Sequence, residues 1–164
     1  MSQEISRAAQ RIREWGAKHP LITIGMVILL TLGPFANKAV HIDDPLFIWT
    51  AEHILKQPGN FYGFDANWGG IMAPMPLNDM NPPAQSYFLA GVMAVFGKQE
   101  FIWHAAMILI AFAAAAGIFQ LARLWCCRPL LAALIAISTP VFLVSATTLM
   151  CDVSMLALWV WVVV

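Results

Sequence analysis

Long apolar runs alternate with short polar segments along most of this chain. Their length and near absence of charge predict membrane-spanning helices, because a bilayer crossing needs about 20 predominantly apolar residues. The predicted spanning helices comprise residues 20–37, 101–122 and 129–147, and a fourth begins at residue 152 and is cut short at Val164. We therefore expect the chain to be a fragment of a longer protein, and to be inactive by itself.

The opening segment, residues 1–19, has a helical pattern of its own. Five apolar residues recur there at helical spacing among basic ones: Ile5, Ala8, Ala9, Ile12 and Trp15. This pattern predicts an amphipathic helix on the membrane surface, and its excess of basic residues predicts a cytoplasmic N-terminus. A cleaved signal peptide is the alternative. Pro34 stands where the cleavage pattern wants a small residue, so an uncleaved helix over 20–37 is favoured.

Residues 38–100 are predicted to form a long external loop. Pro, Gly, Asn and Asp are frequent in its first part, and such irregular backbone cannot satisfy its hydrogen bonds in lipid. Two interfacial helices are expected within it, at residues 45–56 and 84–97. The second would reach roughly 21 Å, short of the ~30 Å hydrocarbon core.

The path of residues 84–97 decides the topology. If this segment crossed the membrane, Asp152 would face the cytoplasm, opposite Asp43 and Asp44. If it lies in the interface, Arg123 and Arg128 are cytoplasmic, as the positive-inside tendency asks. Asp152 then emerges on the same outer face as Asp43 and Asp44, so we prefer this arrangement.

Composition narrows the class of protein. Charged residues make up 11% of the chain and hydrophobic residues 60%, whereas a soluble domain normally carries about 25% charged residues. This balance predicts an all-α integral membrane protein. The net charge is zero and no nucleic-acid-binding motif is present, so we expect no nucleic acid partner. The three cysteines, Cys126, Cys127 and Cys151, lack metal-ligand spacing.

The stretch "HIDDPLFIWTAEHIL" places an acidic pair, Asp43 and Asp44, close behind an apolar run. A carboxylate near a bilayer centre costs at least about 2.5–3.5 kcal/mol, so such residues are rare unless they are used. Helix capping is the structural alternative for this pair and for Asp152. His53 shares a predicted helix face with Trp49, where it would contact substrate or anchor the loop at the interface.

The order of several motifs in this chain resembles that in the membrane glycosyltransferases of the GT-C fold. The closest resemblance is to the dolichyl-phosphate-mannose protein mannosyltransferases and aminoarabinose transferases. The acidic pair is followed by an aromatic and a small residue, here Phe47 and Ala51. A Pro-Pro pair then precedes an apolar helix ending in "FG", as in "NPPAQSYFLAGVMAVFG". A second acidic motif follows a helix carrying "TP", as in "STPVFLVSATTLMCDVSMLALW". Two departures are Asn81, where the family often has Lys or Arg, and Ser154, where it commonly has Pro.

The resemblance implies a partial GT-C-like transmembrane helix bundle in a bacterial inner membrane. It implies sugar transfer from a polyprenyl-phosphate-linked donor in membrane lipid to an acceptor that the sequence does not identify. Asp43 and Asp44 would be the catalytic residues, one of them as the general base. The analogy with the family favours Asp43 as the base, with Asp44 orienting the acceptor or tuning the base. The candidate substrate-binding residues are Asp152, Asn81 and His53, and Asp43, Asp44 and Asp152 would hold a divalent cation, Mg²⁺ or Mn²⁺, if one is used.

The alternative function is a non-enzymatic polytopic membrane protein, either a transporter piece or an assembly subunit. Transporters favour ionisable groups near the bilayer midplane on broken helices. This chain instead places its acids at predicted helix ends. One further pattern concerns packing: Ala113 and Gly117 form a small-xxx-small face that predicts a close helix contact.

Overall fold

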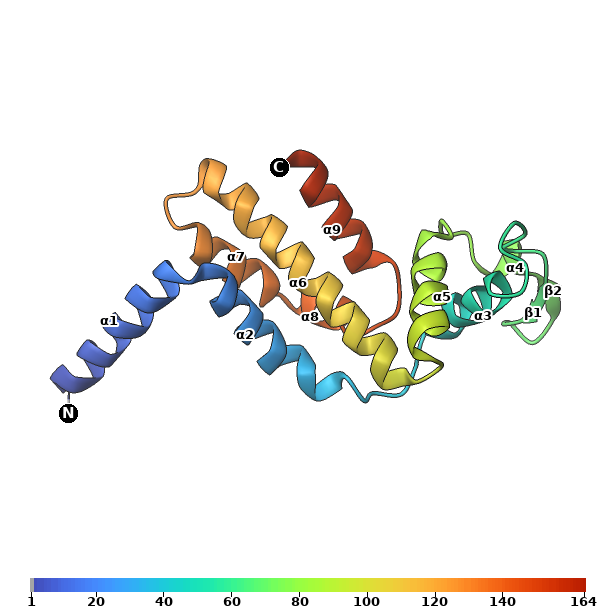
Figure 1. The fold of residues 1–164 in the computed structure, drawn as a ribbon, viewed down its shortest axis with the longest axis horizontal. Coiled ribbons are helices and arrows are strands. Elements are labelled where there is room, and N and C mark those ends of the chain that lie inside the picture. The colour runs from blue at the N-terminus through green and yellow to red at the C-terminus, as the bar shows by residue number, and fades with distance from the viewer. Residues whose placement is uncertain (1) are drawn as a thin grey trace.

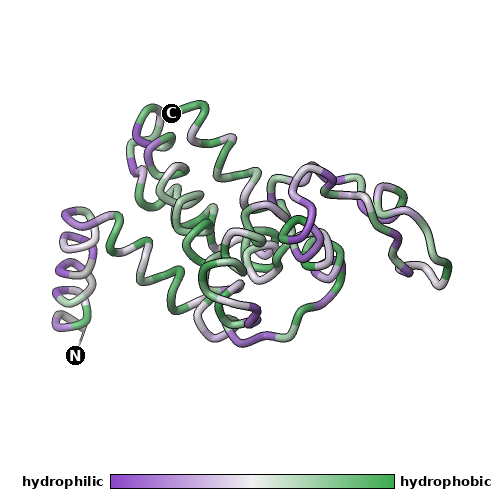
Figure 2. Tube along the Cα trace, turned by 45° about the vertical axis from the view of Figure 1, so that its right-hand side comes forward, coloured by the Kyte–Doolittle hydropathy of each residue, from purple (hydrophilic) through white to green (hydrophobic). Residues whose placement is uncertain are grey.

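The computed structural model describes residues 2–164, most of them in helices (Figure 1). Helix α6 (Glu100–Trp125) is the longest of these, with 26 residues. Four other helices lie around or beside it: α2 (Pro20–Leu32), α7 (Pro129–Ile137), α8 (Pro140–Ser145) and α9 (Asp152–Val163). The N-terminal helix α1 (Ser2–Lys18) projects away from this group and is bent by 109° from the segment that follows it. In Figure 2 the grouped helices are largely hydrophobic, whereas α1 alternates between polar and apolar positions.

A smaller group of elements follows α2 and its terminal 3₁₀ turn η1 (Gly33–Phe35). It contains a two-stranded antiparallel sheet and three helices: α3 (Asp44–Ile54), β1 (Asp65–Asn67), β2 (Met72–Pro74), α4 (Met75–Asn78) and α5 (Ala84–Phe96). Asp65 pairs with Pro74 and Asn67 with Met72. Helix α3 packs on α5, and α5 packs on α6.

Two hydrophobic cores correspond to these two groups. The first joins α2, α6, α7 and α9 through fully buried side chains such as Ile24, Ile28 and Ala115. The second joins α3 and α5 to the first turns of α6, with Phe47, Leu89 and Met107 at its centre. Leu149 and Cys151, which precede α9, also belong to the second core, so the entrance to α9 is packed against α3 and α5.

The expected fold class, a transmembrane helix bundle of the GT-C type, is wrong. Among the helices of residues 2–164, α6 alone is long and apolar enough to cross a membrane, with a second span only if the bent pair α1–α2 counts as one. A multi-pass arrangement is therefore unsupported. The two-stranded sheet also departs from an all-α fold. A buried core helix of a soluble protein can have the same length and apolar composition as α6.

Proline residues explain why the predicted spanning helices 20–37 and 129–147 are too long. Helix α7 ends at Ile137 after nine residues, and Pro140, which has no backbone N–H, opens α8. The side chain of Thr139 caps α8 by accepting a 3.4 Å hydrogen bond from Phe142 N. Pro34 likewise lies where α2 gives way to η1 after 13 residues. The apolar run continues through both breaks, which is why hydropathy alone did not reveal them.

The small-residue face at Ala113 and Gly117 receives α9, as the sequence pattern predicts. Trp161 donates a 2.9 Å hydrogen bond from Nε1 to the carbonyl oxygen of Ala113. A Cβ atom on Gly117 would lie 2.9 Å from Val160 Cγ1 and 3.1 Å from Trp161 Nε1. The absence of a side chain at residue 117 therefore sets how closely α6 and α9 approach.

We expect Gly117→Ala to destabilise the fold relative to Gly91→Ala, its matched control. Overpacking costs roughly 1–3 kcal/mol, whereas Gly91 lies inside α5 with no atom within 4 Å of an added Cβ. Both changes gain about 1 kcal/mol in helix propensity, so the difference between the two free energies of unfolding isolates the contact. Denaturant unfolding followed by circular dichroism measures it. Equal unfolding free energies would show that α9 does not pack closely on Gly117.

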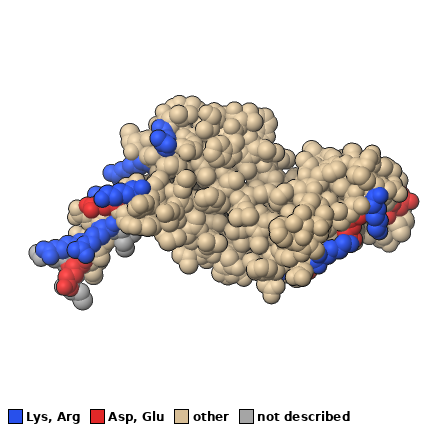
Figure 3. Space-filling view, in the orientation of Figure 1, with Lys and Arg blue, Asp and Glu red and all other residues tan. Residues whose placement is uncertain are grey.

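Charged side chains gather at two ends of the molecule and leave the middle of the face drawn in Figure 3 uncharged. Helices α2, α7 and α8 contain no Lys, Arg, Asp or Glu. The end formed by α1 and the α6–α7 turn is mainly basic: Glu4, Arg7, Arg11, Arg13, Glu14, Lys18, Arg123 and Arg128. The opposite end is mainly acidic: Lys38, Asp43, Asp44, Glu52, Lys56, Asp65, Asp79, Lys98, Glu100 and Asp152.

Candidate functional site

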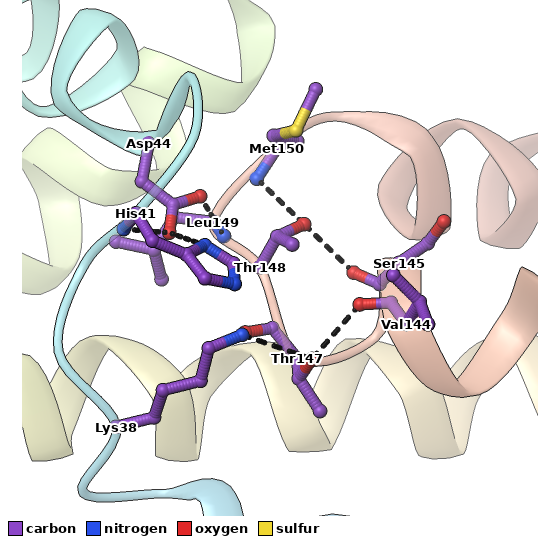
Figure 4. A network of polar contacts seen from close by, with 9 residues as sticks. All are labelled: Lys38, His41, Asp44, Val144, Ser145, Thr147, Thr148, Leu149 and Met150. Atoms are coloured by element: carbon purple, nitrogen blue, oxygen red, sulfur yellow. Dashed lines mark hydrogen bonds and ion pairs between the residues drawn. The ribbon is translucent and has the colours of Figure 1, made fainter.

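Asp44 opens α3 with a side chain that solvent does not reach, its exposed fraction being 0%. Its Oδ1 accepts a 2.7 Å hydrogen bond from Leu149 N, and its Oδ2 accepts one of 3.1 Å from His41 N (Figure 4). Leu149 lies 105 residues further along the chain. Asp44 therefore fastens the chain entering α3 to the segment that leads into α9, and both of its oxygens are occupied in doing so.

Lys38 makes a second connection between the same two segments. Its Nζ donates to the carbonyl oxygen of Thr147 at 3.2 Å and to Thr147 Oγ1 at 3.3 Å. Burial lowers the pKa of Lys38, and the negative charge of Asp44 opposes that shift. We call Lys38, His41, Asp44, Thr147 and Leu149 the Asp44 network. Because it holds both segments at once, it fixes the backbone on either side of Asp43.

Asp43 lies beside the Asp44 network without belonging to it. It occupies the N-cap position of α3, yet its half-buried side chain makes no hydrogen bond within residues 2–164. Ile42 has a φ of 52°, a left-handed conformation that a β-branched residue rarely adopts. The side chain of Ile42 is 61% exposed, so packing does not account for this strain. Strained backbone of this kind clusters at functional sites, and here it directly precedes a carboxylate without a partner.

Asp152 and Asn81 lie at the entrance to α9. Asp152 is exposed in the first turn, where a carboxylate interacts favourably with the helix N-terminus. The preceding residue, Cys151, is buried, and its Sγ donates to Asn81 Oδ1 at 3.6 Å. Burial raises the pKa of Cys151, and the charge of Asp152 acts in the same direction. The structure thus brings Asn81 and Asp152 close to Leu149, the residue that Asp44 binds.

Two buried polar residues that the sequence pattern did not single out support this region. Asp79, 2% exposed, accepts hydrogen bonds of 2.9 Å from both N and Nδ2 of Asn81. Gln85 in α5 donates to the carbonyl oxygen of Leu149 at 2.9 Å and accepts from Ser154 Oγ at 2.6 Å. The spacing of Asp79 and Asn81 is that of an Asx turn, which sequence could have revealed. For Gln85, the sequence shows only a polar residue within an apolar helix, which does not predict its contacts.

Tyr62 closes this cluster from the loop before β1. Its hydroxyl donates to the carbonyl oxygen of Asn81 and lies 3.5 Å from Asp79 Oδ2. Burial and the neighbouring Asp79 raise the pKa of Tyr62 to about 12, because both disfavour the phenolate. The neutral phenol is therefore the form that fits the folded protein.

A pH titration tests the placement of Tyr62. A phenol whose pKa is raised in the folded state stabilises the fold below its ordinary pKa of 10.0, and that contribution is lost as the pH rises through about 12. We expect Tyr87→Phe protein, which retains Tyr62 as its one tyrosine, to form tyrosinate near pH 12, as followed by ultraviolet absorbance. Tyrosinate formation complete by pH 10 in folded protein would place Tyr62 in solvent.

His53 lies apart from the other candidate residues. It is near the C-terminal end of α3, ten residues beyond Asp43, which corresponds to roughly 15 Å of helix. Its ring stacks on Phe64 with 4.8 Å between centroids. His53 and Trp49 line the same open cleft, as their shared helix face predicts, but this cleft does not include the acidic pair.

No metal site links the three candidate carboxylates. Within residues 2–164, no group of three or more His, Cys, Asp or Glu side chains is arranged to hold a metal ion. Asp44 in addition uses both of its oxygens for backbone N–H groups. The optional cation site of Asp43, Asp44 and Asp152 is therefore not formed by these side chains.

Comparisons with protein-family models, with curated proteins and with solved structures found no match. The structure brings four of the five candidate residues to the junction of α3, α5 and α9, namely Asp43, Asp44, Asn81 and Asp152, and leaves His53 in a separate cleft.

Proposed function

We propose that the protein is a membrane glycosyltransferase, in which Asp43 is the general base for sugar transfer from a polyprenyl-phosphate donor to an acceptor hydroxyl. The observation that carries the proposal is the contrast within the acidic pair. Asp44 is fully buried and bound to two backbone N–H groups. Asp43 is half-buried, its side chain has no hydrogen-bond partner among residues 2–164, and it follows the strained Ile42. The resemblance of the surrounding motifs to glycosyltransferases supports the same assignment.

The chemistry requires a carboxylate that is positioned and accessible. A neutral hydroxyl is a poor nucleophile, so a base must accept its proton while the oxygen attacks the anomeric carbon. The Asp44 network holds the backbone at Asp43 and leaves its carboxylate able to accept that proton. Asp152, exposed at the start of α9, and Asn81 would orient the acceptor or donor beside it.

The distribution of charge and apolar surface supports a place in the membrane, with α6 as the spanning helix. Large apolar side chains are exposed along the uncharged middle, including Leu30 at 77%, Leu109 at 70% and Val162 at 79%. The end of α6 that carries Arg123, with Arg128 just after it, would lie in the cytoplasm, following the positive-inside tendency. The mainly acidic end, with Asp43, would then lie at the outer face, where a lipid-linked donor can reach it.

The transporter alternative has less support. Ion-coupled transporters place ionisable groups within the membrane, whereas α2, α7 and α8 carry none and those of α6, Glu100, His104 and Arg123, lie toward its two ends. The carboxylate of Asp43 lies outside these helices, at the acidic end.

A transfer assay tests the proposed function. Membranes containing the protein would be incubated with a radiolabelled polyprenyl-phosphate sugar, and the label would be followed into water-soluble and lipid acceptors. We expect transfer that depends on the protein and on the phosphate-linked lipid. Absence of transfer and of donor hydrolysis across a panel of such donors would refute the proposal.

A further inference from the structure

An open cleft of about 510 Å³ lies between α3 and β1, away from the Asp44 network. Its volume falls in the range of roughly 300–1,000 Å³ typical of small-molecule sites. One wall is a single face of α3, which carries Trp49, Glu52 and His53, continued by Lys56 in the turn after the helix. The opposite wall is Phe64 with the residues of β1, including Asn67.

Aromatic rings shape the inside of this cleft. Trp49 is 36% exposed and meets Trp68 edge to face, with 6.1 Å between ring centroids. His53 is fixed by stacking on Phe64, and its Nε2 is a buried polar atom without a hydrogen-bond partner in the described chain. Buried polar atoms are normally paired, so this atom is left for water or a bound group.

Polar groups with fixed positions lie among these rings. Glu52 Oε1 is 2.7 Å from Lys98 Nζ, which ties the carboxylate to the segment after α5. Asn67 is held in the antiparallel pair with Met72 and offers an amide from the other wall. Carboxylate, amide and ammonium groups facing an aromatic surface can hydrogen-bond to hydroxyl groups while the rings cover C–H groups.

We propose that this cleft binds a neutral saccharide, the sugar portion of the acceptor. A pyranose presents an apolar C–H face, which the negative face of an indole attracts, and a rim of hydroxyl groups. The stretch of α3 from Asp43 to His53, roughly 15 Å long, would separate the reacting hydroxyl from the bound sugar. The identity of the ligand as part of the acceptor rests on the proposed function, but its binding can be measured without transfer.

Calorimetric titration of the chain with neutral disaccharides tests the inference. The protein would be held in lipid nanodiscs, because sugar-headed detergents would occupy the cleft, and maltose, cellobiose and lactose would serve as probes. We expect saturable binding of at least one probe. Trp49→Ala should weaken it at least tenfold by removing the stacking surface, and Asn67→Ala several-fold by removing a hydrogen bond. Trp159→Ala, which removes a 67% exposed indole from α9, should leave it unchanged.

The outcomes separate this inference from the proposed function. Failure of every probe to bind would overturn the saccharide site, as would equal binding by wild type and Trp49→Ala. If binding depends on Trp49 but no sugar is ever transferred, the site stands and the transferase proposal fails. If transfer occurs and Trp49→Ala changes neither binding nor the KM for acceptor, the transferase proposal stands and the saccharide site fails.

Discussion

Replacing Asp44 with alanine is expected to destabilise the protein by roughly 3–5 kcal/mol. The change leaves the buried N–H group of Leu149 and the partly buried N–H group of His41 without acceptors, at a cost of about 1–3 kcal/mol each. It also removes the negative charge that favours the protonated form of Lys38. Because the free energy of unfolding of a domain is typically only about 5–15 kcal/mol, the variant should unfold at a much lower denaturant concentration. Denaturant unfolding followed by circular dichroism measures this loss.

The adjacent carboxylate provides the matched control. Asp43→Ala removes a side chain without a hydrogen bond within residues 2–164, so we expect its unfolding free energy to stay within about 0.5 kcal/mol of wild type. Asp44→Asn keeps one acceptor oxygen and should fall between the two alanine variants. If Asp43→Ala and Asp44→Ala are equally stable, the division of the acidic pair into a structural and an accessible carboxylate is wrong.

Several helices predicted from the sequence lie close to observed ones, but others were predicted to continue too far. Apolar runs and turn residues predicted helices at 45–56, 84–97 and 101–122, close to the observed α3, α5 and α6. Hydropathy reports burial or lipid contact, and it passes unchanged through a proline break such as Thr139–Pro140. These helix breaks are the main difference between the observed fold and the predicted bundle. The short sheet, with only three residues in each strand, was too small to give an alternating pattern.

The candidate site was predictable only as a set of unusual residues. Two adjacent acids beside an apolar run stand out in any sequence of this composition, but their separate roles depend on a contact across 105 residues, from Asp44 to Leu149. No local pattern records such a contact. The strain at Ile42 is equally invisible in sequence, since the residue type argues against a left-handed conformation. His53 is near the acidic pair in the sequence, but it lies at the other end of α3 and is therefore far from the pair in space.

The division of the molecule into two charged ends and an apolar middle relates the Asp44 network and Asp43 to the proposed substrate. The side chains of the Asp44 network lie where the uncharged helices meet the acidic end, so they anchor that end to the apolar group. A lipid-linked substrate has the same division, with an apolar tail and a polar head. Under the proposed function, a carboxylate such as Asp43, beside that boundary, would act on the polar head while the tail stays in lipid.

Asp43→Asn is expected to lower kcat of sugar transfer by about 10²–10⁴-fold, the range that a positioned general base contributes. The amide has nearly the same size as the carboxylate but cannot accept the proton of the acceptor hydroxyl. Since the Asp43 side chain makes no hydrogen bond in the described chain, the loss should come without a change in folding. Initial rates with a radiolabelled polyprenyl-phosphate sugar measure it, alongside the unfolding free energy of each variant.

The separate effects on kcat and KM distinguish a base from a carboxylate that only binds substrate. Loss of a base lowers kcat. A binding role would instead raise KM and leave kcat nearly unchanged. Glu100→Gln, which neutralises an exposed acid in the first turn of α6 at the same end of the molecule, should retain wild-type kcat. If Asp43→Asn transfers sugar as fast as Glu100→Gln does, Asp43 is not the base.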